Sequence, residues 1–202
     1  MLRVTDRQLD LFSRCPKKLF YTLASPDEVA PATDDDFLIQ ALILKAYQRQ
    51  AIGRPPTWQT FCKWLERAYI ERLLARESSP SQEQLQSVLE DSLRFRGGLN
   101  RWWRDEYTST LDHDAYANLK LSSQVSQGSY LEATIDILLI SREYLTCSII
   151  EIVGQADTQD LDRSMICRTQ TYLVYKELGI LPTEYIRLFV DSSVSRGPLN
   201  FI

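Results

Sequence analysis

The chain has 202 residues, 44% of them hydrophobic and 25% charged, and a formal net charge of −4. This length and composition suit a globular protein with one sizeable core, and the net charge argues against a strongly basic nucleic-acid binder. No apolar run approaches the roughly 20 residues that a membrane helix requires, and no apolar signal core follows the N-terminus. We therefore expect a cytoplasmic protein without a membrane partner, built as one domain over residues 1–202, with a helical part over 1–110 and a sheet core over 111–202.

Charge is divided unevenly along the chain. Residues 1–104 carry 16 Lys and Arg against 13 Asp and Glu, whereas residues 105–202 carry 7 against 14. A surface that faces phosphates is therefore expected in the first half of the chain, and a metal site in the second half.

The cysteine and histidine content argues against a zinc site. The four cysteines, at positions 15, 62, 147 and 167, lie far apart and form no C-x-x-C pair, which is typical of free thiols in a reducing cytoplasm. The single histidine, His113, stands between two aspartates and is expected in a surface loop. Because no pairs of zinc ligands are visible, no zinc is expected.

The first half of the chain predicts helices. The expected segments are residues 6–24, 35–51, 57–76 and 81–107, the last of them interrupted or bent at Gly97-Gly98. Capping boxes of Thr5 with Gln8 and of Ser81 with Gln84 mark two of the helix starts. Pro16 is expected to bend or interrupt the first helix.

The second half predicts strands around one further helix. Strands are expected over residues 119–127, 130–140, 144–153 and 184–190. Residues 141–143 suit a hairpin link, and the tail from Asp191 is expected to be irregular. A helix is expected over 158–178, with Leu161, Met165, Tyr172 and Tyr175 facing inward. These elements predict an α/β (α+β) fold, in which a mixed central sheet follows an N-terminal helical layer.

Asp136 and Glu151 are the candidate catalytic acids and metal ligands. Each is flanked by Ile, Leu or Val, and a hairpin would bring the two together at one end of the sheet. Two adjacent carboxylates repel each other unless a cation lies between them, and Mg²⁺ prefers such oxygen ligands. The alternative is that both side chains lie at strand ends in solvent.

Two groups of cationic residues have competing interpretations. Arg94, Arg96, Arg101 and Arg104 interleave with Phe95, Trp102 and Trp103, either as a surface that stacks bases or as a helix whose tryptophans are buried. We favour burial of the tryptophans. Arg14, Lys17 and Lys18 form either a phosphate contact or a solvated helix face.

Three separated segments carry a resemblance to a known family. They are Arg7-Gln8-Leu9 to Phe12 with Cys15-Pro16, Lys18 and Phe20-Tyr21; Thr134-Ile135-Asp136-Ile137-Leu138; and Ile149-Ile150-Glu151-Ile152-Val153-Gly154. In this order the chain resembles the RecB-type branch of the PD-(D/E)XK nuclease superfamily, which includes RecB-like CRISPR-associated exonucleases. The resemblance spans nearly the whole chain and implies a restriction-endonuclease-like fold, in which Asp136 and Glu151 hold Mg²⁺ or Mn²⁺.

The resemblance also implies residues that contact nucleic acid on the helix after the hairpin. That helix carries Gln-x-x-x-Tyr in the family. Tyr172 fits this pattern with Arg168 at the glutamine position, and Gln170 with Tyr175 is a looser match. Cys15 matches the first cysteine of family members with an iron–sulfur cluster, but no cysteine follows Cys167, so no cluster is expected.

Two departures from the family pattern concern the chemistry. The family lysine two residues after the second acid is Val153 here, and the best overlay places Leu44 where a histidine ligand often stands. That lysine positions the attacking water and balances charge, and valine does neither. Arg168 and Arg163 are the candidates to supply cationic charge from the following helix, but an arginine does not act as a base at neutral pH.

The function expected from this resemblance is a DNA-engaging protein of nuclease fold that is catalytically weak or inactive. If active, it is a Mg²⁺- or Mn²⁺-dependent deoxyribonuclease that hydrolyses phosphodiester bonds in DNA repair or defence. One alternative is a protein-interaction or scaffold subunit that does not bind nucleic acid. Another is an active DNA exonuclease whose catalytic cation has migrated to a different position.

Overall fold

The structure is a computed structural model that describes residues 2–14, 34–77, 79–143, 146–153, 164–189 and the backbone of 194–198. Cys15, Lys17 and Lys18, and most of the loop between Glu151 and the last helix, lie outside these ranges. None of the described helices is both long enough and apolar enough to cross a membrane.

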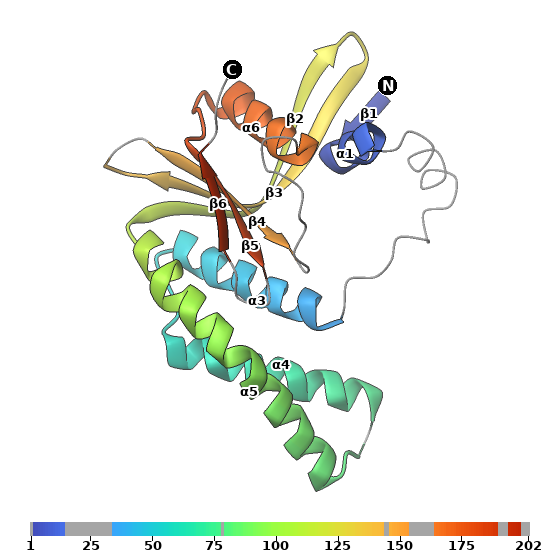
Figure 1. Ribbon diagram of the computed structural model, residues 1–202, viewed down its shortest axis with the longest axis vertical. Helices are drawn as coiled ribbons and strands as arrows, with labels where there is room; N and C mark the ends of the chain where they lie inside the picture. Colours follow the sequence, from blue (N-terminus) through green and yellow to red (C-terminus); the bar gives the residue numbers. More distant parts are fainter. Residues whose placement is uncertain are drawn as a thin grey trace.

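Helices dominate the first half of the chain and strands the second (Figure 1). The order is β1 (Leu2–Thr5), α1 (Asp6–Arg14), α3 (Asp34–Ala51), α4 (Trp58–Arg76), α5 (Gln82–Asp105), the 3₁₀ turn η2 (Tyr107–Thr110), β2 (His113–Ser126), β3 (Ser129–Ser141), β4 (Cys147–Val153), α6 (Met165–Leu178), β5 (Glu184–Phe189) and β6 (Val194–Pro198).

The strands form one open, mixed sheet in the order β1-β3-β4-β5-β6. β1 and β4 pair with successive parts of the same edge of β3, and β2 pairs with its other edge. The β1–β3 and β4–β5 pairs are parallel, and the remaining pairs are antiparallel. The predicted hairpin of the two acid-bearing strands is thereby confirmed, as is the crossover through α6 to a parallel strand. The prediction of a mixed α/β architecture is also confirmed.

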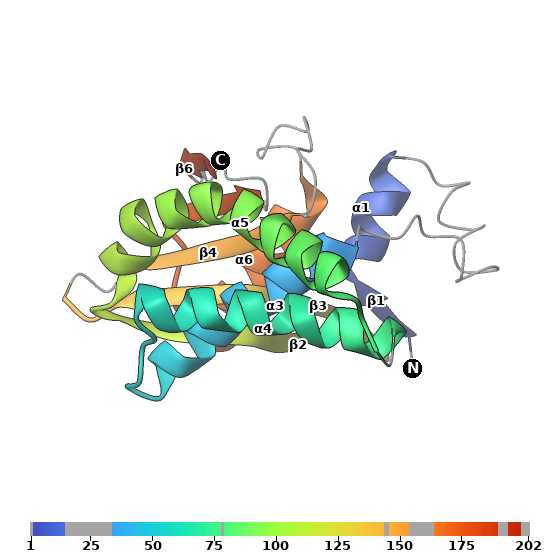
Figure 2. The ribbon, with the colours of Figure 1, turned by 90° about the horizontal axis from the view of Figure 1, so that it is seen from below.

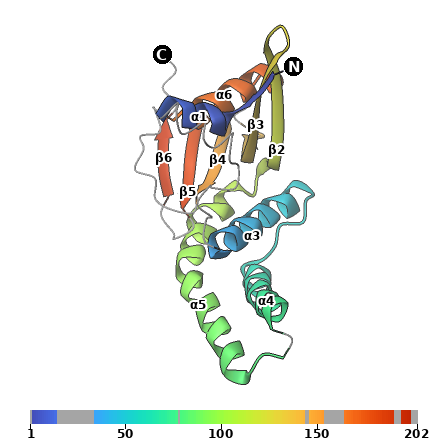
Figure 3. The same cartoon turned by 90° about the vertical axis from the view of Figure 1, so that its right-hand side faces the viewer.

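Helices cover both faces of this sheet (Figure 3). On one face, α6 contributes Cys167, Leu173 and Val174 to a core shared with β3, β4 and β5. Helix α1 contacts α6 on this same side. None of the three described cysteines forms a disulfide, and Cys147 and Cys167 are buried in this core.

On the opposite face, α3 lies next to the sheet, and the antiparallel pair α4 and α5 packs outside it (Figure 2). Trp102 and Trp103 are 3% and 8% exposed, and their rings contact those of Tyr107 and Phe61 in tilted arrangements. The expectation that the tryptophans between the α5 arginines belong to the core is therefore confirmed.

Both predicted capping boxes are present. The Thr5 hydroxyl accepts from the Gln8 backbone N–H, and the Gln8 side chain accepts from the Thr5 N–H. Ser81 and Gln84 make the same reciprocal pair at the start of α5. These bonds satisfy donors that a helix start leaves unpaired, and the first of them fixes where β1 turns into α1.

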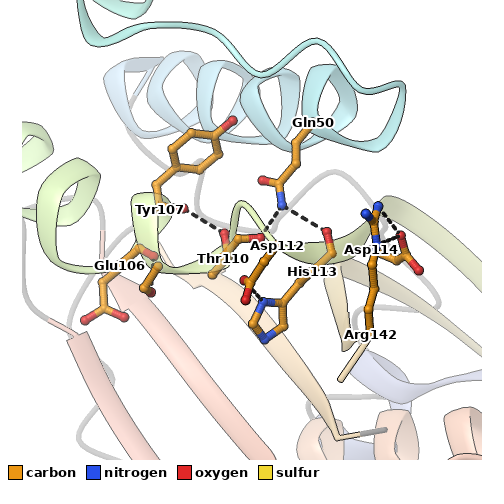
Figure 4. Close-up of polar contacts among 9 residues, drawn as sticks. Gln50, Glu106, Tyr107, Thr110, Asp112, His113, Asp114 and Arg142 are labelled. Carbon is orange, nitrogen blue, oxygen red and sulfur yellow. Dashed lines mark hydrogen bonds and ion pairs between the residues drawn. The ribbon is translucent and has the colours of Figure 1, made fainter. Parts of the chain in front are cut away.

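The sequence predicted His113 in a surface loop, but it is the first residue of β2 (Figure 4). Its ring Nδ1 lies 2.6 Å from the Asp112 carboxylate. The buried Gln50 amide donates to the backbone carbonyls of Thr110 and His113, which ties the end of α3 to the start of this strand. The strand therefore begins at His113, six residues earlier than the predicted start at residue 119.

Two further expectations about the chain ends were wrong. Residues 2–5 form β1, parallel to β3, where no strand was predicted. Residues 194–198 form β6, antiparallel to β5, where an irregular tail was predicted. Both strands are short, with too few residues for a periodic signal of their own, and they are held by backbone pairing, β1 with the distant β3 and β6 with the preceding β5.

The sequence predicted an interruption or a bend at Gly97-Gly98, and there is no interruption, because α5 runs as one helix from Gln82 to Asp105. Leu99, Trp102 and Trp103 bury the last turns of α5 against α4 and the sheet, and this burial outweighs the low helix propensity of two glycines.

Substitution of Gly97 measures how much stability a glycine costs within this helix. A Cβ added there meets no atom within 4 Å, so we expect Gly97→Ala to stabilise the protein by about 1 kcal/mol through helix propensity alone. Urea unfolding of the variant and the wild type measures the difference. A loss of stability would show that the backbone at this position is not helical.

Candidate functional site

The candidate site lies at a gap along one edge of β3. That edge pairs with β1 over residues 129–132 and with β4 over residues 137–140. Between them, no described strand pairs with residues 133–136 on this edge. Backbone groups that strands leave unpaired need other partners when they are buried, and polar side chains converge on the gap.

Asp136 satisfies one of these backbone groups. Its Oδ2 accepts a hydrogen bond of 2.8 Å from the Ile152 N–H of β4. Asp136 and Glu151 each lie one residue beyond the last recorded β3–β4 pair, Ile137 with Ile150. The two acids are therefore adjacent where the strands separate, which confirms the proximity predicted from the sequence.

Gln170 of α6 fills the other side of the gap. Its Nε2 donates to the Thr134 carbonyl at 3.2 Å and to Oδ2 of Asp6 at 3.0 Å. Because the amide nitrogen has two acceptors, the amide oxygen is directed to Tyr185, whose hydroxyl lies 3.0 Å away. Gln170 is 4% exposed, so this orientation is fixed by protein groups.

Glu151 forms an ion pair with a buried arginine. The Arg187 Nε donates to Glu151 Oε2 at 3.0 Å, and the Tyr185 hydroxyl lies 3.2 Å from the same oxygen. The Arg187 side chain is 3% exposed and the Glu151 side chain 17%. Parallel pairing of β4 and β5 places Glu151 directly beside Arg187. The result is a polar chain that runs from β5 to the start of α1 through Glu151, Tyr185 and Gln170.

Burial raises the pKa of Asp136 to about 6 from its ordinary value of 3.8. The Ile152 N–H and the Arg7 guanidinium oppose this rise, and the Glu151 and Asp6 carboxylates add to it. Burial also raises the pKa of Asp6, against the Gln170 hydrogen bond. Negative charge is thus concentrated in the gap, and a bound cation would favour the ionised form of Asp136.

A cavity of about 880 Å³ opens on this gap. Asp136 and Asp6 lie on its wall, together with the α3 residues Gln40 and Leu44 and with side chains of the β2–β3 hairpin. Leu44, which the sequence overlay put at the family histidine position, therefore borders the same space as Asp136. Glu151 does not line this cavity but lies beside it, held by Arg187.

The other residues predicted to form the site are only partly brought together. Gln170 lies in the polar chain, whereas Arg168 and Tyr172 are exposed on α6. The predicted inward positions Tyr172 and Tyr175 are therefore wrong. Arg14 ends α1, but its side chain lies outside the described part of the structure, as do Lys17 and Lys18.

Three residues of the polar network were missed from the sequence: Asp6, Tyr185 and Arg187. Arg187 was detectable, because an arginine within the apolar run Tyr185 to Phe189 needs a buried partner. Asp6 and Tyr185 had no such signal, since their partners depend on where α6 crosses the sheet.

The donor set fits a hard divalent cation. Asp136 Oδ1 and Glu151 Oε1 have no partner among the described residues, and carboxylate oxygens are the ligands that Mg²⁺ and Mn²⁺ prefer. The described residues contain no group of three or more His, Cys, Asp or Glu side chains placed to hold a metal ion. Asp136 and Glu151 would supply two carboxylate ligands from the described part of the chain, and water or phosphate oxygens would complete the shell.

Asp136→Asn is expected to stabilise the protein above pH 6 in the absence of metal. Because the pKa of Asp136 is raised in the folded state, folding favours the protonated acid. The stability that this residue contributes is therefore full below pH 3.8 and is lost as pH rises through about 6. Asparagine removes this loss, which is worth up to about 3 kcal/mol.

Unfolding in EDTA between pH 4 and pH 8 measures this effect as the difference in stability between variant and wild type. The difference should grow across pH 4–7 and then level off. A difference that is constant with pH would show that Asp136 is not perturbed by burial.

Comparisons with known proteins place little constraint on this chain. No protein-family model matches it, and no curated protein matches its sequence. Among solved structures, one described as the crystal structure of SSO0001 is similar at 14% identity and a TM-score of 0.29, covering 83% of this chain and 79% of that chain.

Proposed function

We propose that this chain is a DNA-engaging protein with a restriction-endonuclease-like fold of the RecB-type PD-(D/E)XK branch and a degenerate catalytic centre. The observation that carries the proposal is the position of Asp136 and Glu151, adjacent where β3 and β4 separate and beside the 880 Å³ cavity. The sequence motifs around both acids support the same family. Asp136 and Glu151 are the residues that would hold Mg²⁺ or Mn²⁺.

Three features support weak or absent hydrolysis. Val153 stands two residues after Glu151, on the same side of β4, where the family has its lysine. Leu44 lines the cavity where a histidine ligand would stand. Arg187 already neutralises one oxygen of Glu151, so a divalent cation would share this carboxylate with a guanidinium.

A metal bound to these carboxylates would polarise a phosphodiester and lower the pKa of a water molecule. The residues of the chain have separate tasks. The Ile152 N–H orients the Asp136 carboxylate, and Arg187 with Tyr185 orients Glu151. Gln170 fixes the spacing between Asp6 and the Tyr185 hydroxyl, so that the start of α1 stays against the gap.

The proposal is tested with labelled single- and double-stranded DNA, incubated with Mg²⁺ or Mn²⁺ and also measured for binding in EDTA. We expect binding by the wild type with at most slow cleavage, and loss of any cleavage in Glu151→Gln. Rapid cleavage that survives this substitution would contradict the assignment of the site, and absence of binding to either DNA would contradict the proposed function.

One observation favours a protein-interaction or scaffold role as a second candidate. Glu151 has its charge compensated inside the fold by Arg187, so the gap does not depend on metal or DNA for its stability. The excess of acidic residues after position 104 points the same way. DNA binding whose affinity falls steeply with salt would exclude this alternative, because phosphate contacts release counterions.

A further inference from the structure

A basic surface lies on the helical layer, where α3 ends and α4 begins. Residues 37–65 contain no Asp or Glu but four cations, although the whole chain has a formal net charge of −4. All four side chains are exposed: Lys45, Arg49, Arg54 and Lys63. The turn between α3 and α4 lies at an outer corner of the molecule (Figure 2). We call these four residues, together with Ile52, the α3–α4 corner.

The fold gathers these cations around one turn of the chain. Lys45 and Arg49 are four positions apart, which places them on the same face of α3. The chain turns back after this helix, and the Arg54 N–H donates to the Arg49 carbonyl at 2.9 Å. The Lys45 Nζ lies 4.5 Å from the centre of the Trp64 ring, which follows Lys63 on α4. The corner therefore combines residues of both helices and of the turn that joins them.

None of the described acids forms an ion pair with a cation of the corner. Three acids of α3 and α4 are paired with arginines outside it: Asp35 with Arg72, Glu66 with Arg96 and Glu71 with Arg67. Like charges at a spacing of four residues on a helix repel each other, so an acidic ligand at the corner would relieve this repulsion.

An apolar side chain lies among these cations. Ile52 directly follows α3 and is 62% exposed, the highest value for a large apolar side chain in the described ranges. One exposed aliphatic residue is ordinary, but an apolar centre with a charged rim is the usual anatomy of a protein interface. A phosphate backbone has no apolar group to cover Ile52, and one aliphatic side chain adds little area for insertion into a lipid surface. The combination therefore favours an acidic protein segment as the ligand.

We propose that the α3–α4 corner docks an acidic segment of a partner protein, whose carboxylates contact the four cations while one of its apolar side chains covers Ile52. This role goes beyond DNA engagement and does not depend on it. No residue of the corner is among those that border the cavity beside Asp136. The corner and the acid pair are therefore separate sites, and each can be tested without the other.

The test is fluorescence anisotropy with a labelled peptide that repeats two glutamates and one leucine, at low and at high salt. We expect the wild type to bind this peptide, with an affinity that falls as salt rises, because salt screens exposed charges. The variant with Lys45→Gln, Arg49→Gln, Arg54→Gln and Lys63→Gln should bind at least about tenfold more weakly. Absence of binding by the wild type would overturn the proposal.

The matched control removes two lysines and two arginines from exposed positions outside the corner: Arg94→Gln, Arg101→Gln, Lys120→Gln and Lys176→Gln. It has the same net charge as the corner variant and should bind the peptide about as well as the wild type. An equal loss of affinity in the two variants would overturn the site, because binding would then follow net charge alone.

A second peptide, with serine in place of every leucine, tests the apolar contact. Ile52→Ser should weaken binding of the leucine peptide about tenfold, since the aliphatic side chain is no longer there to be buried. The same substitution should leave binding of the serine peptide unchanged. An equal effect on both peptides, or none on either, would show that Ile52 does not contact the segment.

Duplex DNA and phosphatidylserine vesicles test the other possible ligands. The corner variant should bind each of them as its matched control does. A selective loss of binding to DNA would make the corner a nucleic-acid surface, and a selective loss of binding to vesicles would make it a membrane surface; either result overturns the proposal. If the wild type binds no DNA, the proposed function fails, and the peptides still decide the role of the corner. Circular dichroism melting of each variant confirms that it is folded.

Discussion

Arg187→Met is expected to cost about 3–5 kcal/mol of folding stability, because it leaves the Glu151 carboxylate in the interior without its cation. Methionine fills a similar length in the apolar strand, so most of the loss comes from charge and hydrogen bonding. Denaturant unfolding at pH 7 in EDTA measures the effect. A loss of this size is a large share of the stability of a typical domain, roughly 5–15 kcal/mol.

The paired substitution separates charge compensation from packing. Glu151→Gln combined with Arg187→Met removes both charges at nearly constant volume and should recover most of the stability, since replacing a whole buried pair is often neutral. Arg187→Lys tests geometry, because lysine lacks the Nε that bonds Glu151. If the double variant is as unstable as Arg187→Met, then packing of the guanidinium, and not the ion pair, stabilises β5.

Val153→Lys is expected to raise metal-dependent DNA cleavage by about 10²–10³-fold over the wild type. Val153 is half-buried at the end of β4, on the same side as Glu151, and a lysine there can extend its stem over apolar neighbours and place its ammonium near the acids. The gain would come from a cation that orients water and balances transition-state charge.

Val153→Met is the control for this experiment, since it has a similar reach and no charge. Any gain in Val153→Lys should be absent in Val153→Met and should disappear when Asp136→Asn is added. Equal cleavage by the lysine and methionine variants would show that the loss of catalysis does not lie in this one position. Leu44 and Arg187 are the next residues to examine in that case.

The part of the site that the sequence predicted is the part encoded locally. Asp136 and Glu151 stand on two β-branched strands joined by a short link, so their proximity follows from a hairpin alone. The helix caps at Thr5 and Ser81 were predictable for the same reason, because each needs only residues within one turn.

The rest of the site depends on contacts between distant segments. Asp6 meets Gln170 across 164 positions of sequence, and β1 pairs with the middle of the chain. The buried side of α6 carries Thr169, Gln170 and Thr171, whereas its exposed side carries Tyr172 and Tyr175. The apolar pattern therefore assigned the wrong face, since the buried side also carries polar residues, and one of them, Gln170, bonds the Thr134 carbonyl at the gap in the sheet.

The most direct test of the central claim, that Asp136 and Glu151 form one cation-binding pair, is a Mn²⁺ titration by calorimetry at pH 7.5. The wild type is predicted to bind one Mn²⁺ per chain, with an affinity that falls as pH drops below about 6, where Asp136 takes up a proton. The Asp136→Asn, Glu151→Gln protein, shown to be folded by its melting curve, is predicted to bind none. An isotherm for this variant equal to that of the wild type would contradict the assignment.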